Sequence, residues 1–170
     1  MKWAIFFILL ILTGCFYNPA ILNLPTFDLP DDKEFIATIN ELDTPYKVWQ
    51  YMEENFTYKS HPYNAVNPYE LWQTGLGDCN DFSTWFAFVL NYHGYEIYQI
   101  RILKDYNHWL GVVVLEDIGY AWLSNLKYYP YFARATFGEI VDTYCSLKGC
   151  SCTGYEVYDY EMNVVEEAVK

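Results

Sequence analysis

The sequence is poor in positive charge and contains no repeats. Its 170 residues include 10 lysines and arginines against 22 acidic residues, for a formal net charge of −12. A surface of this sign repels the phosphates of nucleic acids and of anionic lipids, so we expect no nucleic-acid partner. The lack of internal repeats and of low-complexity tracts excludes repeat arrays and compositionally biased linkers.

Apolar residues, in contrast, are abundant. They make up 53% of the chain, and aromatic residues make up 21%. This composition suits a well-packed globular protein and excludes intrinsic disorder. A chain of this length is large enough for one hydrophobic core, so we expect one domain and a monomer.

The first fifteen residues, MKWAIFFILLILTGC, have the pattern of a targeting segment. Lys2 precedes a run of about ten apolar residues, which is short for a membrane span and suits a signal peptide. The ending Leu12-Thr13-Gly14-Cys15 resembles the bacterial lipobox, in which the cysteine is lipidated and becomes the new N-terminus. We therefore predict a signal peptide over 1–14 and a lipid anchor on Cys15 that holds the protein to a membrane outside the cytoplasm. An ordinary signal peptide or an uncleaved anchor is the alternative.

The rest of the chain divides into a tether and a domain. Residues 15–30 contain three prolines and few charges, which indicates an extended tether. Residues 31–170 are predicted to form the single domain, with short helices first and strands afterwards. Helices followed by an antiparallel sheet indicate an α+β fold. The expected later elements are strands at 95–103, 107–115 and 119–125, a helix near 136–146, a cysteine-rich loop, one strand and a frayed acidic tail.

The segment GLGDCNDFSTW places a cysteine at the start of a helix. Asp78 is an expected N-cap, and Asp81 lies three residues on, where an acid completes a capping box. Cys79 is then the first helical residue, in a helix that runs to about His93. Because a helix N-terminus lowers the pKa of a thiol, this position favours a nucleophilic cysteine. The apolar face of the helix is expected to pack on the sheet through Phe82, Trp85, Phe86 and Val89.

A nucleophilic cysteine needs a base, and the chain has only three histidines. His93 is excluded because it lies roughly 21 Å along the same helix. His61 lies in a loop in which nothing fixes its position. His108 begins a strand and shares a face with apolar residues, where a histidine is more often a core residue. If Cys79 is a nucleophile, His108 is the best of the three candidates for its base.

A polar residue on the next strand would complete a triad. A hairpin with a two- or four-residue loop pairs Leu110 with Asn125, which makes Asn125 the same-face neighbour of His108. An odd-length loop would reverse this parity. Asp117 is about 30 Å from His108 along the strand, and Asp105 is an outside candidate.

The order of a cysteine, a histidine on a strand and a polar residue on the next strand resembles the transglutaminase-like superfamily, and within it the small bacterial transglutaminase-like cysteine peptidases. The similarity covers residues 44–128 and includes NPYELWQTGLGDCNDFSTW, NHWLGVVV and GYAWLSN. It implies a transglutaminase-like fold of the papain-like class, with Cys79 as nucleophile and His108 as general base. Asn125 stands where the family usually has Asp; its amide can orient the imidazole but cannot offset its charge.

The resemblance implies an enzyme that cleaves or transfers amide acyl groups through a thioester, without a cofactor. The substrate would be a peptide or protein amide, with the cell envelope as one candidate source. Gln73 is a candidate oxyanion donor, the alternative being a solvated turn residue. The alternative function is a catalytically silent module that binds an envelope peptide or protein.

Three further cysteines, Cys145, Cys150 and Cys152, cluster near the C-terminus. Zinc would need a fourth ligand, and no histidine or cysteine lies nearby in the sequence, so we expect no metal. Outside the cytoplasm, one disulfide within the cluster and none to Cys79 is the simpler expectation.

Overall fold

The computed structural model describes residues 28–169 except 63, 105–106, 117 and 134–135. Within these residues the chain forms five helices and a six-stranded antiparallel sheet, which confirms the predicted α+β class. The predicted signal peptide over 1–14, Cys15 and most of the tether lie outside the described residues. No helix in the described part is long and apolar enough to cross a membrane.

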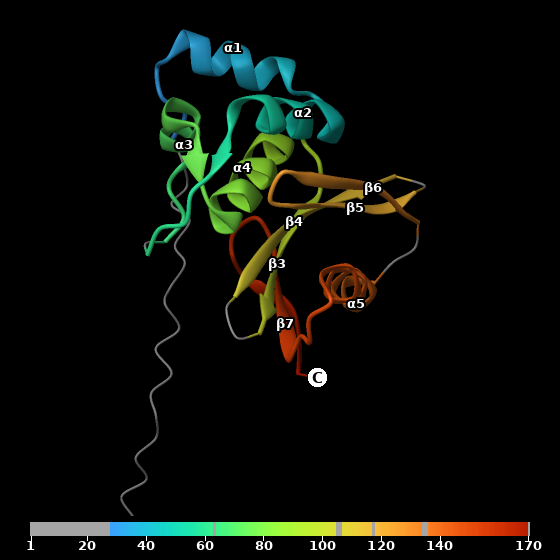
Figure 1. Ribbon diagram of the computed structural model, residues 1–170. Helices are drawn as coiled ribbons and strands as arrows, with labels where there is room; N and C mark the ends of the chain where they lie inside the picture. The colour runs from blue at the N-terminus through green and yellow to red at the C-terminus, as the bar shows by residue number, and fades with distance from the viewer. Residues whose placement is uncertain (1–27, 63, 105–106, 117, 134–135, 170) are drawn as a thin grey trace, which may run out of the picture.

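Four helices precede the sheet and gather in the upper part of Figure 1. Each begins after a short polar side chain that accepts a backbone N–H, as N-cap residues do. These caps stop the helices from extending into the preceding loops. The helices are α1 (Lys33–Glu41), α2 (Pro45–Asn55), α3 (Pro68–Thr74) and α4 (Cys79–Tyr92).

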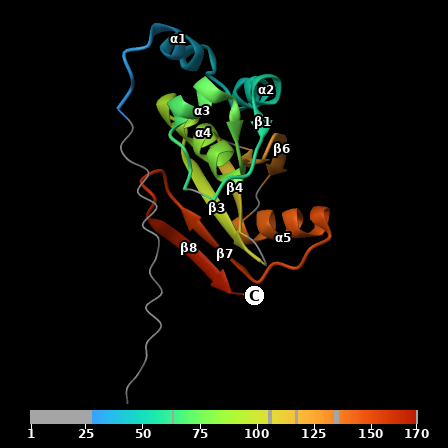
Figure 2. The same cartoon turned by 60° about the vertical axis from the view of Figure 1, so that its left-hand side comes forward.

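The large sheet has the order β6-β5-β4-β3-β7-β8, so β3 and β4 lie at its centre. The C-terminal strands β7 and β8 complete the sheet on the far side of β3, as Figure 2 shows. A short parallel pair, β1 (Thr57–Tyr58) and β2 (Leu76–Gly77), lies before α4. The strands of the large sheet are β3 (Ile97–Leu103), β4 (His108–Leu115), β5 (Gly119–Ser124), β6 (Lys127–Ala133), β7 (Gly154–Tyr158) and β8 (Val164–Val169).

The two faces of the sheet are covered by different helices. On β4, Val113 belongs to the buried cluster that includes α4, whereas Leu110 and Val112 belong to a second cluster with α5 (Phe137–Lys148). A Cβ on Gly111 would meet the Phe86 side chain at 2.8 Å, so α4 lies directly against β4 there. Odd-numbered residues of β4 therefore face α4, and even-numbered ones face α5.

The C-terminal end differs from the prediction. The expected frayed acidic tail is wrong, because Val164–Val169 pairs with β7 as the edge strand β8. Its side chains are almost all exposed, so backbone hydrogen bonds rather than apolar burial hold it to the sheet.

Candidate functional site

The start of α4 has the capping box that the sequence predicts. The Asp78 side chain accepts a hydrogen bond from the Asn80 N–H at 2.9 Å, and Asp81 Oδ2 accepts one from the Asp78 N–H at 2.6 Å. These bonds fix the first turn and place Cys79 as its first residue. Cys79 is half-buried and is not in a disulfide.

The sulfur of Cys79 lies against β4. The backbone N–H of Trp109 donates toward it, which lowers the pKa of the thiol, as do the N–H groups of Cys79 and Asn80. Burial acts more strongly in the opposite direction, and the Asp78 charge adds to it, so the pKa of Cys79 is raised. The helix start contributes the expected lowering, but the expected net lowering of the pKa of Cys79 is wrong, because burial outweighs it.

His108 is buried at the first position of β4 and carries a defined set of contacts. Its Nε2 is 3.0 Å from Ser124 Oγ, and its ring stacks on Tyr144 of α5, with centroids 4.9 Å apart. Burial, followed by the charges of Lys104 and Lys148, lowers the pKa of His108 to about 3. The imidazole is therefore neutral at pH 7 and a weak base where it stands.

The backbone brings Cys79 close to the start of β4, where His108 lies. The Cys79 sulfur faces the N–H of Trp109, the residue after His108. The His108 imidazole has the parity of Leu110 and turns to the α5 face. Within the described residues, no hydrogen bond joins the thiol to the imidazole.

Ser124, not Asn125, contacts His108, and the predicted pairing of Leu110 with Asn125 is wrong. Leu115 pairs with Gly119, which leaves an odd, three-residue loop between the strands, and Leu110 therefore pairs with Ser124. Asn125 instead occupies the β5–β6 turn with φ 52°, a left-handed conformation that Asn tolerates well. Its Oδ1 is buried and has no hydrogen-bond partner in the described structure. The other two acids considered, Asp105 and Asp117, lie outside the described residues.

His61, which the sequence leaves unplaced, lies at the start of α4. Its Nε2 is 2.7 Å from Asp81 Oδ2, and this hydrogen bond is the main cause of the raised pKa of His61. The Val66 N–H donates to the other Asp81 oxygen at 2.8 Å. The ligand atoms of His61, Asp78 and Asp81 lie within 4.8 Å of one another, a spacing compatible with a metal ion. Since both Asp81 oxygens already accept hydrogen bonds, we assign the group to holding His61 and the backbone of Val66 on α4.

The remaining site predictions have mixed outcomes. Gln73 is exposed on α3 and hydrogen-bonds with Tyr69, so its role as an oxyanion donor stays a prediction.

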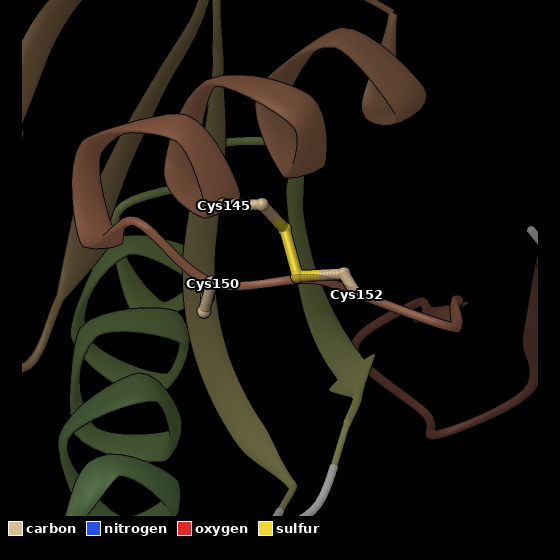
Figure 3. A group of neighbouring side chains, drawn as sticks. All are labelled: Cys145, Cys150 and Cys152. Carbon is tan, nitrogen blue, oxygen red and sulfur yellow. A yellow bond between two sulfur atoms is a disulfide. The ribbon is translucent and has the colours of Figure 1, made fainter.

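The predicted disulfide is confirmed as Cys145–Cys152, with Cys150 and Cys79 free, and Figure 3 shows this cluster at the end of α5. His93 caps α4, with Nε2 2.8 Å from the Ile39 carbonyl, as expected of a structural histidine.

No protein-family model matches the sequence, and no curated protein matches it either.

The raised pKa of Cys79 leads to a direct prediction. Iodoacetamide alkylation of Cys79 in the folded protein should follow a titration with its midpoint above that of the unfolded chain, because burial and Asp78 disfavour the thiolate. In the urea-unfolded chain the midpoint should return to about 8.5. Peptide mass spectrometry across a pH series measures both. A folded-state midpoint below 8.5 would contradict this and would place a positive partner beside the sulfur.

Proposed function

We propose that this protein is a lipid-anchored, extracytoplasmic cysteine enzyme of the transglutaminase-like type. It cleaves or transfers amide acyl groups of a peptide or protein through a thioester on Cys79. One observation carries the proposal. Cys79 is the first residue of α4, and its thiol lies against β4, the strand that begins with His108. Ser124 holds Nε2 of that imidazole and leaves Nδ1 as the atom for proton transfer.

The chemistry requires a proton transfer from Cys79 to His108. A neutral imidazole takes the thiol proton, and the thiolate attacks the carbonyl carbon of the amide. Backbone N–H groups at the start of α4 are suited to receive the developing oxyanion. The imidazolium then protonates the leaving amine, and water or a second amine resolves the thioester.

In the described arrangement the imidazole hydrogen-bonds to Ser124 and stacks on Tyr144, and no hydrogen bond joins it to the sulfur. Its stacking on Tyr144 and its pKa of about 3 define a resting state, in which thiol and imidazole are both uncharged. The proposed reaction requires the ring to leave Tyr144 and approach Cys79. Any movement that reduces the burial of the ring restores part of its basicity, because burial is the main cause of the low pKa.

The uncharged state of both Cys79 and His108 favours a second candidate function. A protonated thiol beside a neutral, stacked histidine suits a catalytically silent module that binds an envelope peptide or protein. The Ser124 hydroxyl beside His108 also favours the silent module, since a hydroxyl cannot offset the charge of an imidazolium as a carboxylate does.

Capture of an acyl-enzyme distinguishes the two functions. The detergent-solubilised full-length protein with Ser124→Ala, which removes the hydrogen bond to His108 and should slow turnover, is incubated with cell-envelope extract and quenched in acid. We expect a hydroxylamine-sensitive mass on the Cys79 peptide and none in a Cys79→Ala, Ser124→Ala control. An unmodified Cys79, with an envelope peptide retained equally by both proteins, would replace the enzyme with the binding module.

The lipid anchor is tested separately. Because the lipobox-like ending places Cys15 at the cleavage site, the protein from its native membrane should begin at Cys15, carry diacylglycerol and partition into detergent. Intact-mass analysis of the purified protein measures this. A chain that begins at Met1, or a cleaved chain without lipid, would contradict the anchor; Cys15→Ala is the matched control and should not be lipidated.

A further inference from the structure

The end of α5 brings a free thiol next to a disulfide. Gly149 adopts a left-handed conformation with φ 62°, and its N–H donates to the Ser146 carbonyl at 3.1 Å. The N–H of Cys150 donates back to the Cys145 carbonyl at 3.0 Å. This pair of bonds is a Schellman motif, which sets the side chain after the glycine against the one five residues earlier. The motif therefore places Cys150 beside Cys145.

The disulfide to Cys152 ties the last turn of α5 to the sheet. Cys152 lies just before β7, and the next residue, Thr153, donates its N–H to the Leu103 carbonyl of β3 at 2.8 Å. The sulfurs of Cys145, Cys150 and Cys152 lie within 4.8 Å of one another. Figure 3 shows Cys150 on the connecting segment, next to the bridge but not part of it.

We propose that these three cysteines form an intramolecular thiol–disulfide exchange site. The Cys150 thiolate attacks Cys145 Sγ, a Cys145–Cys150 bond forms, and the Cys145–Cys152 bond breaks. Cys152 leaves as a thiolate and takes up the proton that Cys150 released. One disulfide and one thiol are present before and after, so the step needs no oxidant or reductant.

The exchange changes what the disulfide connects. In the Cys145–Cys152 form, the bridge joins α5 to the start of β7. In the Cys145–Cys150 form, it closes a loop within the helix cap, and the covalent tie to the sheet is lost. The residue before Cys145 is Tyr144, which stacks on His108 and accepts a hydrogen bond from Lys104 Nζ at 3.1 Å.

The site therefore controls the residue that holds His108 in its resting position. Loss of the tie to β7 loosens the last turn of α5 and frees the imidazole from Tyr144. This consequence for catalysis rests on the proposed function, in which His108 must move toward Cys79. The exchange itself, and the release of His108, are measured without any substrate.

The exchange is tested by mapping the disulfide in the wild-type protein. The full-length protein is incubated at pH 8, quenched in acid with N-ethylmaleimide and digested with trypsin, which cleaves after Lys148. Fragmentation should find the label on Cys150 in part of the protein and on Cys152 in the rest, whereas Cys150→Ser should never carry it on Cys152. Label confined to Cys150 after prolonged incubation, or a Cys150–Cys152 bridge with Cys145 labelled, would overturn the proposal.

The release of His108 is tested with two locked variants. Cys150→Ser retains only the Cys145–Cys152 bridge, and Cys152→Ser permits only Cys145–Cys150. Diethylpyrocarbonate should modify His108 at least fivefold faster in Cys152→Ser than in Cys150→Ser. His93, which is hydrogen-bonded to Ile39 at the other end of α4, should react equally in both and reports intact folding. Equal His108 rates with equal His93 rates would overturn the link to His108. Neither readout depends on turnover, so failure of the proposed enzyme activity would leave both unchanged.

Discussion

Substitution of Phe86 by alanine is expected to lower the free energy of unfolding by about 3–5 kcal/mol. Phe86 is fully buried in the cluster between α4 and the sheet. The lack of a side chain at Gly111 lets the Phe86 ring lie directly on β4, so one wall of the cavity left by alanine is strand backbone. Urea denaturation followed by circular dichroism measures the change.

An exposed aromatic residue provides the control. Tyr46→Ala removes a side chain that is 58% exposed and should cost less than about 1 kcal/mol. Gly111→Ala tests the same contact from the strand, because the added methyl group would meet Phe86 at 2.8 Å. If Phe86→Ala costs no more than Tyr46→Ala, the face of α4 is assigned wrongly.

The capped helices were predictable because their signals are local. Asp78 and Asp81 are three residues apart, and the bonds they form involve only the first turn of α4. The same holds for α5, where Thr136 and Glu139 form a second capping box before the predicted helix. Such bonds need no information from the rest of the chain.

The edge strands β6 and β8 were not predicted, because their sequences lack the usual strand signals. Pro130 interrupts β6, and a proline without an N–H is tolerated in an edge strand but argues against a central one. In β8 the adjacent Glu166 and Glu167 break the apolar alternation. Charge on an exposed edge disfavours pairing with other chains, so the feature that hid this strand suits its position.

The error at Asn125 has a single physical cause. Side chains alternate along a strand, so changing the hairpin loop from an even to an odd number of residues shifts every partner by one. Ser124 thus replaces Asn125 opposite Leu110, and the histidine contact falls to Ser124. The sequence shows roughly where the turn between β4 and β5 lies, but not which residues are the last of β4 and the first of β5.

The face of His108 depends on an element that follows much later in the chain. The sequence correctly groups His108 with Leu110 on one face of β4, but not with the helix that covers this face. That helix is α5, which contributes Tyr144 from 36 residues further on. Contacts at such a separation leave no local signal.

The last prediction concerns the residues of the candidate site. The substrate is the amide whose acyl group is identified on Cys79 in the acyl-enzyme experiment. On this substrate, Cys79→Ala and His108→Ala should each lower kcat/KM by on the order of 10⁴-fold or more, because each removes an obligatory participant in acyl transfer. Ser124→Ala should lower it only about tenfold, the effect of one neutral hydrogen bond of roughly 1.4 kcal/mol that orients the imidazole. Steady-state kinetics at pH 7 measure all three.

Asn125→Gly is the matched control for Ser124→Ala. Glycine accepts the φ of 52° in the β5–β6 turn, so this variant removes the amide while leaving the backbone unstrained. Because Asn125 lies outside the face that His108 occupies, we expect kcat/KM to change by less than about twofold. A large loss in Asn125→Gly with none in Ser124→Ala would restore Asn125 as the partner of the imidazole. Wild-type rates in His108→Ala would remove His108 from the reaction. His61, which lies at the start of α4 beside Asp81, would then be the next base to test.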